Sequence, residues 1–315
     1  MISIIIPAYN TEDKIESCVN SILEQPFSDI EIIIVNDGST DNTAKIIDNL
    51  SNKVPQIKTI HTKNQGAYNA RLVGVKESKG EWITFVDSDD TITPNAIDNL
   101  FKYASDGNDI IIGTISINNT RIFKHQIIGH LSSNQYLQAL LSNQTSIGPC
   151  AKLFKRDLFK DVITPEERIT VNEDLLLLIY LASKAQKIYI TNNIICYNYI
   201  FRERSMRTSL MSIEKWTHLF KLIEGIINPI NNPNINQAFI NFKLIRIKYQ
   251  MIDRGLYISS HDPLYKDIIG SDLLPTLSKQ EYQIVRIMKS PTFQRISHIK
   301  FLCHNLCRNI LNLIR

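Results

Sequence analysis

A chain of 315 residues is long enough for one large domain and an appended region. With 43% hydrophobic and 21% charged residues, its composition is ordinary for a soluble globular protein. The formal net charge of +4 is too small to indicate nucleic-acid binding, and five scattered cysteines favour free thiols in a reducing compartment over a disulfide framework.

The first half of the chain alternates short apolar runs with amphipathic helical patterns. Continuous β-branched runs of this kind are typical of strands that are buried on both faces of a parallel sheet. We expect strands at Ile4–Ile6, Ile30–Val35, Ile57–His61 and Trp82–Val86, and helices at Glu12–Leu23, Asp41–Leu50 and Ala67–Ser78. This order predicts an α/β fold with a doubly wound, mostly parallel sheet flanked by helices.

Beyond Asp90 the alternation is less regular. The segments Ile110–Ile117 and Arg121–Ile128 flank a turn-forming Asn118-Asn119-Thr120 and predict a hairpin at the edge of the sheet. Later patterns predict helices at Asn134–Leu141, Glu173–Ser183, Ile213–Ile227 and Ile235–Ile258. The segment Lys187–Tyr199 predicts one or two further strands.

No segment predicts export or a membrane span. The first residues lack the basic region and cleavage site of a signal peptide. The longest apolar run, Leu175–Ala182, is far shorter than the ~20 residues that cross a bilayer. We therefore expect a cytoplasmic protein.

Polar segments follow each of the four expected strands. They are Pro7 to Asn10, Asn36 to Asp41, Lys63 to Gly66 and Asp87 to Asp90. In a doubly wound sheet, ligands bind in the crevice at the carboxyl ends of the strands. We expect one crevice to collect an aromatic ring, several carboxylates and a glycine-containing loop.

The triplet Asp87-Ser88-Asp89 directly follows a buried apolar strand. Two carboxylates two residues apart form a hard-oxygen site that suits Mg²⁺ or Mn²⁺, together with substrate phosphates. Such an ion would stabilise the charge on a leaving diphosphate. The alternative is a helix N-cap, in which Asp90 or Thr91 would start the helix that follows.

The segment that begins at Asp37 also has two interpretations. Asp, Gly, Ser and Thr before a helix form a turn and a cap. Alternatively, the Asp37 carboxylate accepts hydrogen bonds from a nucleobase or a ribose.

Taken together, these segments resemble the bacterial family 2 glycosyltransferases of the GT-A fold. The resemblance rests on four segments that occur in one order: Ile4 to Asn10, Val35 to Asp41, Asn64-Gln65-Gly66 with Ala70-Arg71, and Phe85 to Asp90. It continues at Asn172-Glu173-Asp174. It covers roughly residues 1–210. It implies a nucleotide-sugar-binding half at 1–105 and an acceptor-binding half at 106–211, whereas the long helical patterns that follow predict a helical C-terminal region at 212–315.

The resemblance implies an inverting enzyme, commonly with a UDP-sugar donor. Residues from the first three strand ends would bind the nucleotide: Pro7, Ala8 and Tyr9 at the uracil, Asp37 at the base, Glu12 near the ribose, and Asn64, Gly66 and Arg71 on the nucleotide side. Asp87 would face the ribose and the metal, Ser88 would lie in the same donor site, and Asp89 would bind the metal.

The resemblance also implies that Asp174 is the general base on the acceptor hydroxyl. Inversion requires in-line attack, so the base must lie across the sugar from the metal. From the residues alone, Asp174 could equally be a carboxylate stabilised in the first turn of a helix. The family's late Tyr-Arg-x-Arg segment appears here without its first arginine, which leaves Arg202, Arg204 and Arg207 as candidates to hold the diphosphate.

The segment from Tyr282 to Arg315 contains six Lys/Arg and no Asp or Glu. Its helical pattern from Ile284 allows two interpretations: a helix packed on the rest of the chain, or an interfacial helix on anionic lipid. A lipid-linked acceptor would account for the second interpretation. Cys303 and Cys307 lack a second ligand pair for zinc.

Together with the predicted metal site, the resemblance implies a metal-dependent hexosyl- or N-acetylhexosaminyltransferase that uses Mn²⁺ or Mg²⁺ and acts on a glycan or lipid-linked acceptor in bacterial surface polysaccharide synthesis. A nucleotidyl- or phosphotransferase would be expected to contain a P-loop, and none is present. The other alternative is a non-enzymatic nucleotide-binding scaffold, which would be expected to have lost Asp89 or Asp174. The C-terminal helices could also support an oligomer.

Overall fold

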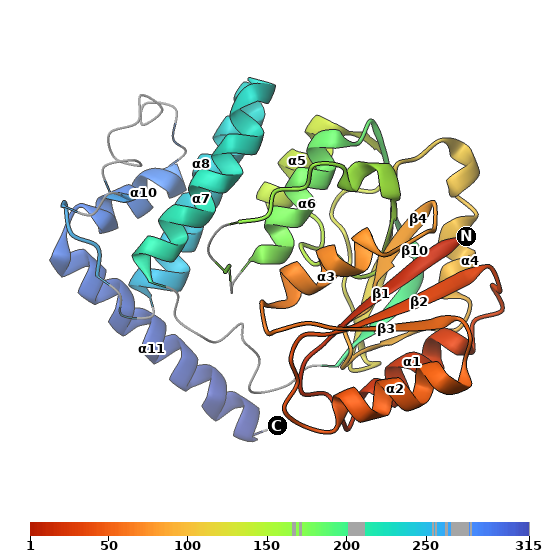
Figure 1. Cartoon of the computed structure of the whole chain (residues 1–315). Helices are drawn as coiled ribbons and strands as arrows, with labels where there is room; N and C mark the ends of the chain where they lie inside the picture. The colour runs from red at the N-terminus through yellow and green to blue at the C-terminus, as the bar shows by residue number, and fades with distance from the viewer. Residues whose placement is uncertain are drawn as a thin grey trace. The chain divides into compact units, whose positions relative to one another are not determined.

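The computed structural model describes residues 1–165, 168–169, 172–200, 212–253, 255, 257–261, 264–265, 277 and 279–314. The chain divides into two compact units, Met1–Ser205 and Met206–Arg315 (Figure 1). The predicted further division of the first unit at residue 105 stays a prediction.

In the described part of the first unit, ten strands form one sheet, and the eight on its main path have the order β3-β2-β1-β4-β9-β6-β10-β5. The strands are β1 (Ile2–Ala8), β2 (Ile30–Asn36), β3 (Ile57–His61), β4 (Trp82–Phe85), β5 (Thr91–Ile92), β6 (Ile110–Ile117), β7 (Arg121–Ile122), β8 (Gly129–Ser132), β9 (Lys152–Lys155) and β10 (Lys187–Tyr199). Strands β3, β2, β1 and β4 are parallel, as is the β6–β10 pair, whereas β9 runs antiparallel to both β4 and β6. The predicted α/β, mostly parallel sheet is confirmed.

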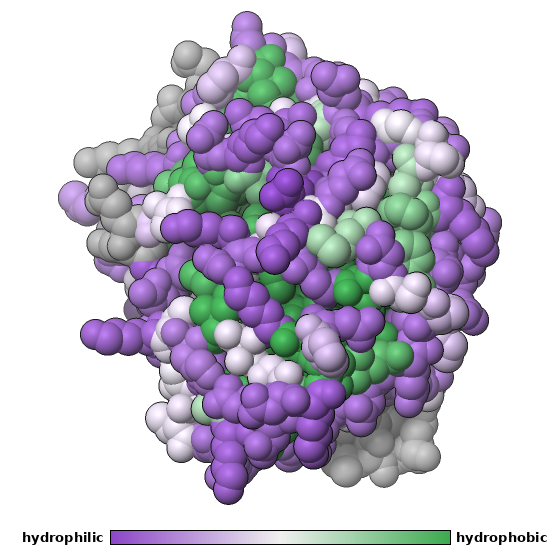
Figure 2. Space-filling view, turned by 45° about the vertical axis from the view of Figure 1, so that its right-hand side comes forward, coloured by the Kyte–Doolittle hydropathy of each residue, from purple (hydrophilic) through white to green (hydrophobic). Residues whose placement is uncertain are grey.

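Helices cover both faces of this sheet. They are α1 (Ile15–Leu23), α2 (Thr43–Lys53), α3 (Ala67–Lys76), α4 (Ala96–Phe101), α5 (Ser133–Leu141) and α6 (Glu173–Lys184), with short 3-10 turns at Ala104–Asp106 and Arg156–Phe159. Figure 1 shows α3, α5 and α6 on one side of the sheet and α1 and α2 on the other. Strand β1 is buried along its whole length, as expected for a strand covered on both faces. The face in Figure 2 is mostly hydrophilic, with smaller hydrophobic areas between polar side chains.

Helix α1 begins three residues later than predicted. The backbone N–H of Glu12 donates to Asp41 Oδ2, and Glu12 Oε2 accepts from the backbone N–H of Asn42. Because Glu12 is engaged with the loop after β2, the helix starts at Ile15.

Beyond β4, the alternative interpretation of Asp90 or Thr91 as a helix cap is wrong, and the predicted edge hairpin is confirmed only in part. Helix α4 begins after Asn95, which has a φ of 58°, and Thr91 belongs to strand β5, so neither Asp90 nor Thr91 caps this helix. The predicted hairpin forms, with Asn118 and Asn119 at positive φ, but its second strand is only two residues long. It also leaves an interior strand rather than the sheet edge, because β6 lies between β9 and β10.

The second unit is helical. It contains α7 (Ile213–Ile227), a short turn at Asn228–Ile230, α8 (Pro233–Arg246), a π-helical segment η5 (Ile247–Ile252), α10 (Lys279–Met288) and α11 (Pro291–Ile314). Its core includes Trp216 and Phe220, whose rings lie 5.3 Å apart, and Phe239 and Phe242 pack on Phe220. The helix predicted at Ile235–Ile258 is shorter in the structure: α8 ends at Arg246 and is followed by the π-helical segment η5.

The basic C-terminal segment forms two helices instead of one. Pro291 opens α11, because proline lacks the backbone N–H that a continuous helix would need and suits a first helical position. Throughout the described residues, no helix has both the length and the apolar character that a membrane crossing requires.

Candidate active site

The carboxyl ends of β2, β1 and β4 lie side by side. These three strands are parallel neighbours, with Ala8 opposite Asn36 and Ile5 opposite both Ile33 and Phe85. The loops that follow them therefore meet at one edge of the sheet. The predicted meeting of these loops at one edge is confirmed, whereas a ligand crevice between them stays a prediction.

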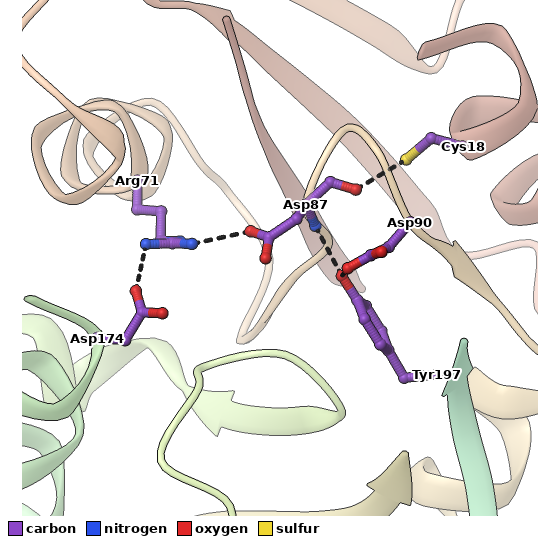
Figure 3. Close-up of polar contacts among 6 residues, drawn as sticks. All are labelled: Cys18, Arg71, Asp87, Asp90, Asp174 and Tyr197. Carbon is purple, nitrogen blue, oxygen red and sulfur yellow. Dashed lines mark hydrogen bonds and ion pairs between the residues drawn. The ribbon is translucent and has the colours of Figure 1, made fainter. Parts of the chain in front are cut away.

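Arg71 joins two predicted site carboxylates that are far apart in the sequence. Its Nη1 donates to Asp174 Oδ1 at 2.6 Å, and its Nη2 donates to Asp87 Oδ1 at 2.8 Å (Figure 3). Arg71 comes from α3, Asp87 follows β4, and Asp174 lies in the first turn of α6. The predicted base and a predicted metal ligand thus share one guanidinium.

The Arg71 side chain is only 4% exposed. Burial alone would lower its pKa, but the Asp174 and Asp87 carboxylates outweigh burial and raise the pKa of Arg71 above its ordinary value. Arg71 therefore remains charged at every working pH. Removing a partner of a buried ion pair typically costs about 3–5 kcal/mol, since the remaining charge is left uncompensated.

The turn after β4 is held by Tyr197 of β10. The hydroxyl of Tyr197 donates to Asp90 Oδ2 at 2.7 Å and accepts from the backbone N–H of Asp87 at 3.1 Å (Figure 3). Asp90 Oδ1 accepts from the backbone N–H of Ile200. Ser88 is buried and Asp89 is half-buried in the same turn. Asp90 therefore anchors the turn that carries Asp87 and Asp89.

Two further carboxylic acids beside the site titrate near neutral pH. Burial, followed by the nearby Asp87, raises the pKa of Asp90 to about 7. Burial, followed by the adjacent Asp174, raises the pKa of Glu173 to about 7. In each case the neighbouring carboxylate adds to the effect of burial, so a cation bound beside Asp87 and Asp174 would lower both pKa values.

Asp37 fastens the loop between β3 and α3. Its two carboxylate oxygens accept from the backbone N–H groups of Gln65 and Gly66, at 2.8 and 2.7 Å. The helix that follows Asp37 begins at Thr43, and its N-cap residue Asn42 makes no side-chain cap hydrogen bond. Asp37 is only 3% exposed, and its Oδ1 also accepts from the Thr62 hydroxyl at 3.4 Å, so the observed role of this carboxylate is to hold the loop.

Arg168 lies over the same loop. Its Nη1 donates to Asn64 Oδ1 at 2.7 Å. Gly66 has a φ of 94°, and a Cβ added there would lie 2.8 Å from Arg168 Nε. The positive φ therefore favours glycine at position 66, whereas the flexible Arg168 side chain could move to admit a Cβ.

The remaining predicted donor residues differ in exposure. Pro7 and Ala8 are buried within β1, whereas the side chain of Tyr9 is 48% exposed. Glu12 Oε2 also accepts from Asn42 Nδ2, at 2.7 Å, and so ties the loops after β1 and β2 together. Arg202, Arg204 and Arg207 lie outside the described residues.

The donor set at Asp87 and Asp89 fits a hard divalent cation. Mg²⁺ and Mn²⁺ commonly bind one or two carboxylates and complete their shell with water and substrate phosphates. Among the residues whose structure is described, no group of three or more His, Cys, Asp or Glu could hold a metal ion by itself. The residues therefore suit an ion that is shared with a phosphate-bearing ligand.

Sequence reasoning missed Tyr197 and Arg168. Tyr197 falls inside a correctly predicted strand, but it contacts a turn more than 100 residues earlier in the chain. Arg168 contacts Asn64 across a comparable separation. No local pattern marks either residue.

A family model and curated relatives that match this chain are all glycosyltransferases. Residues 3–163 match the model of the family described as Glycosyl transferase family 2. The chain is 33% identical over 227 residues to Glycosyltransferase GlyG of Streptococcus pneumoniae, covering 66% of this chain and 73% of GlyG. It is 30% identical over 300 residues to Glycosyltransferase GlyA of the same organism, which covers 89% of this chain, although the chain spans only 42% of GlyA.

A solved structure is similar across most of the chain. S. aureus TarS 1-349 in complex with UDP-GlcNAc superimposes with a TM-score of 0.72 and covers 95% of this chain and 88% of TarS. The sequence identity is 21%, so this likeness establishes the fold.

Proposed function

Because the chain belongs to glycosyl transferase family 2, we propose that it is an inverting, metal-dependent enzyme that moves a hexose or N-acetylhexosamine from a UDP-sugar to a hydroxyl group. We propose a glycan or a lipid-linked sugar as the acceptor, in the synthesis of a bacterial surface polysaccharide. TarS binds UDP-GlcNAc on the same fold, which supports a UDP-sugar as the donor.

The observation that carries this proposal is the position of Arg71 between Asp87 and Asp174. A guanidinium bound to both carboxylates keeps the proposed base and the proposed donor site in a fixed relation. Transfer to a hydroxyl needs such an arrangement, because the attacking oxygen and the leaving diphosphate must lie on opposite sides of the sugar.

In the proposed reaction, the acceptor hydroxyl attacks the anomeric carbon from the side opposite the diphosphate. Asp174 takes the hydroxyl proton as the new C–O bond forms. The bond from the anomeric carbon to the diphosphate oxygen breaks, and its electron pair leaves with UDP. Arg71 holds Asp174 in orientation through the 2.6 Å hydrogen bond.

Asp89 and Asp87 would hold Mn²⁺ or Mg²⁺. When bound, the ion neutralises charge on the diphosphate. For the nucleoside, we propose that Tyr9 and Asp37 contact the uracil, with Glu12 near the ribose and the Asn64–Gly66 loop on the phosphate side. The hydrogen bonds from Gln65 and Gly66 to Asp37 support this assignment, because they couple the two loops that would enclose the nucleoside.

The first test is UDP release from a panel of UDP-sugars with Mn²⁺, for the wild type and for Asp89→Ala. We expect slow donor hydrolysis by the wild type that is abolished by EDTA and by the substitution. Asp157→Ala is the matched control, because the Asp157 side chain is 78% exposed in a different part of the unit. This control is expected to release UDP at the wild-type rate.

The result that contradicts the proposal is equally specific. If folded wild-type protein releases no nucleotide from UDP-, GDP- or dTDP-sugars, the hypothesis that the protein is a glycosyltransferase is wrong. Binding of nucleotide without turnover would then favour a non-enzymatic nucleotide-binding scaffold.

A further inference from the structure

Helix α11 packs the opposite way round from most amphipathic helices. A helix on a globular unit normally buries its apolar stripe and exposes polar residues. In α11, Gln294 is 1% exposed and Ser297 is also buried. By contrast, Ile299, Leu302 and Leu306 are 58%, 52% and 62% exposed.

The buried polar face is tied to the second unit by specific hydrogen bonds. Gln294 Oε1 accepts from the backbone N–H of Ile258, and Gln294 Nε2 donates to the carbonyl oxygens of Ile258 and Met288, all at 2.8–2.9 Å. Ser297 Oγ donates to Asp253 Oδ1. These bonds satisfy buried polar groups, so turning the helix to bury its apolar face would leave them unpaired.

The outward face is a continuous apolar stripe. Ile296, Ile299, Cys303 and Leu306 are exposed and spaced three, four and three residues apart, which places them on one side of the helix. Exposed stripes of this kind mark surfaces that contact a partner or a membrane.

The charge on this helix is of one sign. Arg295 and Lys300 are both exposed, and no Asp or Glu occurs between Pro291 and Ile314. At about 3.6 residues per turn, Arg295 and Lys300 fall on opposite flanks of the apolar stripe. Apolar residues in the middle and basic residues on both flanks are what a helix lying in the plane of an anionic bilayer requires.

A groove of about 530 Å³ lies beside α11 within the same unit. Its walls combine basic groups with apolar and aromatic ones: Lys248, Lys300, His304, Tyr249, Phe293 and Ile296. Lys248 is ion-paired with Asp253, which also lines the groove, so Lys300 is the ammonium group that would meet a phosphate headgroup, with apolar walls beside it for the start of an acyl chain.

We propose that α11 is an interfacial helix that binds the surface of a bilayer containing anionic phospholipid. A second copy of the chain is the less favourable occupant, because pairing of α11 with itself would bring two basic helices together with no acidic residue on either to offset the repulsion. The proposal rests on the proposed function in one respect: a lipid-linked acceptor would be drawn from this surface.

The test is cosedimentation of the full chain with vesicles of phosphatidylcholine, with and without phosphatidylglycerol. We expect binding only to vesicles that contain phosphatidylglycerol, and weaker binding at high salt because the charge attraction is screened. The double variant Ile299→Asp/Leu306→Asp is expected to lower the vesicle affinity at least about tenfold, since both residues would enter the apolar layer.

The matched control is Ile128→Asp in the first unit. Ile128 is 61% exposed, so the control introduces one acidic side chain at a comparably exposed isoleucine that belongs to the first unit and not to α11. It is expected to bind vesicles like the wild type. Circular dichroism should be unchanged in both variants, because the substituted side chains are exposed.

Three outcomes would overturn the proposal: no binding to anionic vesicles, equal binding to both vesicle types, or wild-type binding by the double variant. If light scattering shows that the wild type is a dimer and the double variant is a monomer, the apolar stripe contacts a second copy of the chain instead. Binding of UDP, measured by thermal shift, tests the proposed donor site, which contains no residue of α11. Its loss would therefore overturn the proposed function without deciding the lipid contact.

Discussion

Helices α6 and α11 are both rich in apolar residues, but the chain uses them in opposite ways. In α6, the eight residues from Leu175 to Ala182 are all buried. In α11, the buried residues include Gln294 and Ser297, whereas Ile299, Leu302 and Leu306 are exposed. The comparison teaches that apolar content does not decide which side of a helix is buried. The partners available to its polar groups decide it as well.

The largest expected effect lies at the first turn of α6. Asp174→Asn keeps the shape of the side chain but removes the proton acceptor, so we expect kcat for sugar transfer to fall about 1,000-fold. The comparison variant in α11 is Ile299→Asp, which should leave kcat for transfer to a water-soluble acceptor unchanged. Steady-state UDP release with such an acceptor measures both. Activity retained by Asp174→Asn would show that another group is the base.

A matched pair of leucines gives the next largest effect. Leu178→Ala in α6 removes a fully buried side chain and should lower the free energy of unfolding by about 2–5 kcal/mol. Leu302→Ala in α11 removes a side chain that is already half in water, and the change should stay within about 0.5 kcal/mol. Urea unfolding monitored by circular dichroism compares the two. Equal losses would mean that Leu302 is covered in solution.

Acid should destabilise the first unit through His125. The imidazole Nδ1 lies 2.8 Å from Thr145 Oγ1, and Nε2 lies 3.0 Å from the carbonyl oxygen of Gly113. Burial lowers the pKa of His125 to about 4, below its ordinary 6.5. The unfolded chain therefore binds this proton more readily than the folded protein does, so stability is fully present above pH 6.5 and is lost as the pH falls toward 4.

His125→Gln tests this effect. The wild type should lose Tm between pH 7 and pH 5, and the variant should lose less over the same interval, whatever its Tm at pH 7. His304 in α11 is exposed, so His304→Gln should leave the wild-type pH dependence unchanged. If His125→Gln keeps the full pH dependence, the acid sensitivity comes from another group.

Much of the first unit could be predicted from the sequence because its signals are local. The isoleucine runs of β1 and β2 are buried on both faces, and the strand at Ile57–His61 has the predicted bounds. The polar residues after these strands were placed correctly at one edge, since parallel neighbours bring their carboxyl ends together.

The contacts that organise the site could not be predicted in the same way. Arg71 meets Asp174 across 103 residues, and a sequence pattern fixes neither the rotamer nor the partner of a long side chain. The sequence also does not predict which face of α11 is buried. Helical periodicity reveals that Ile296, Ile299 and Leu306 share a face, but only the backbone acceptors near Ile258 determine that the opposite face packs inward.

One guanidinium serving two carboxylates also constrains how this protein can change. Arg71, Asp87 and Asp174 come from three separate segments, so no single local substitution preserves their balance of charge. Losing Arg71 leaves two carboxylates uncompensated, and losing either carboxylate leaves Arg71 held on one side only. The three positions should therefore behave epistatically. In a directed-evolution library, improved variants that alter one of them should carry a compensating change at another.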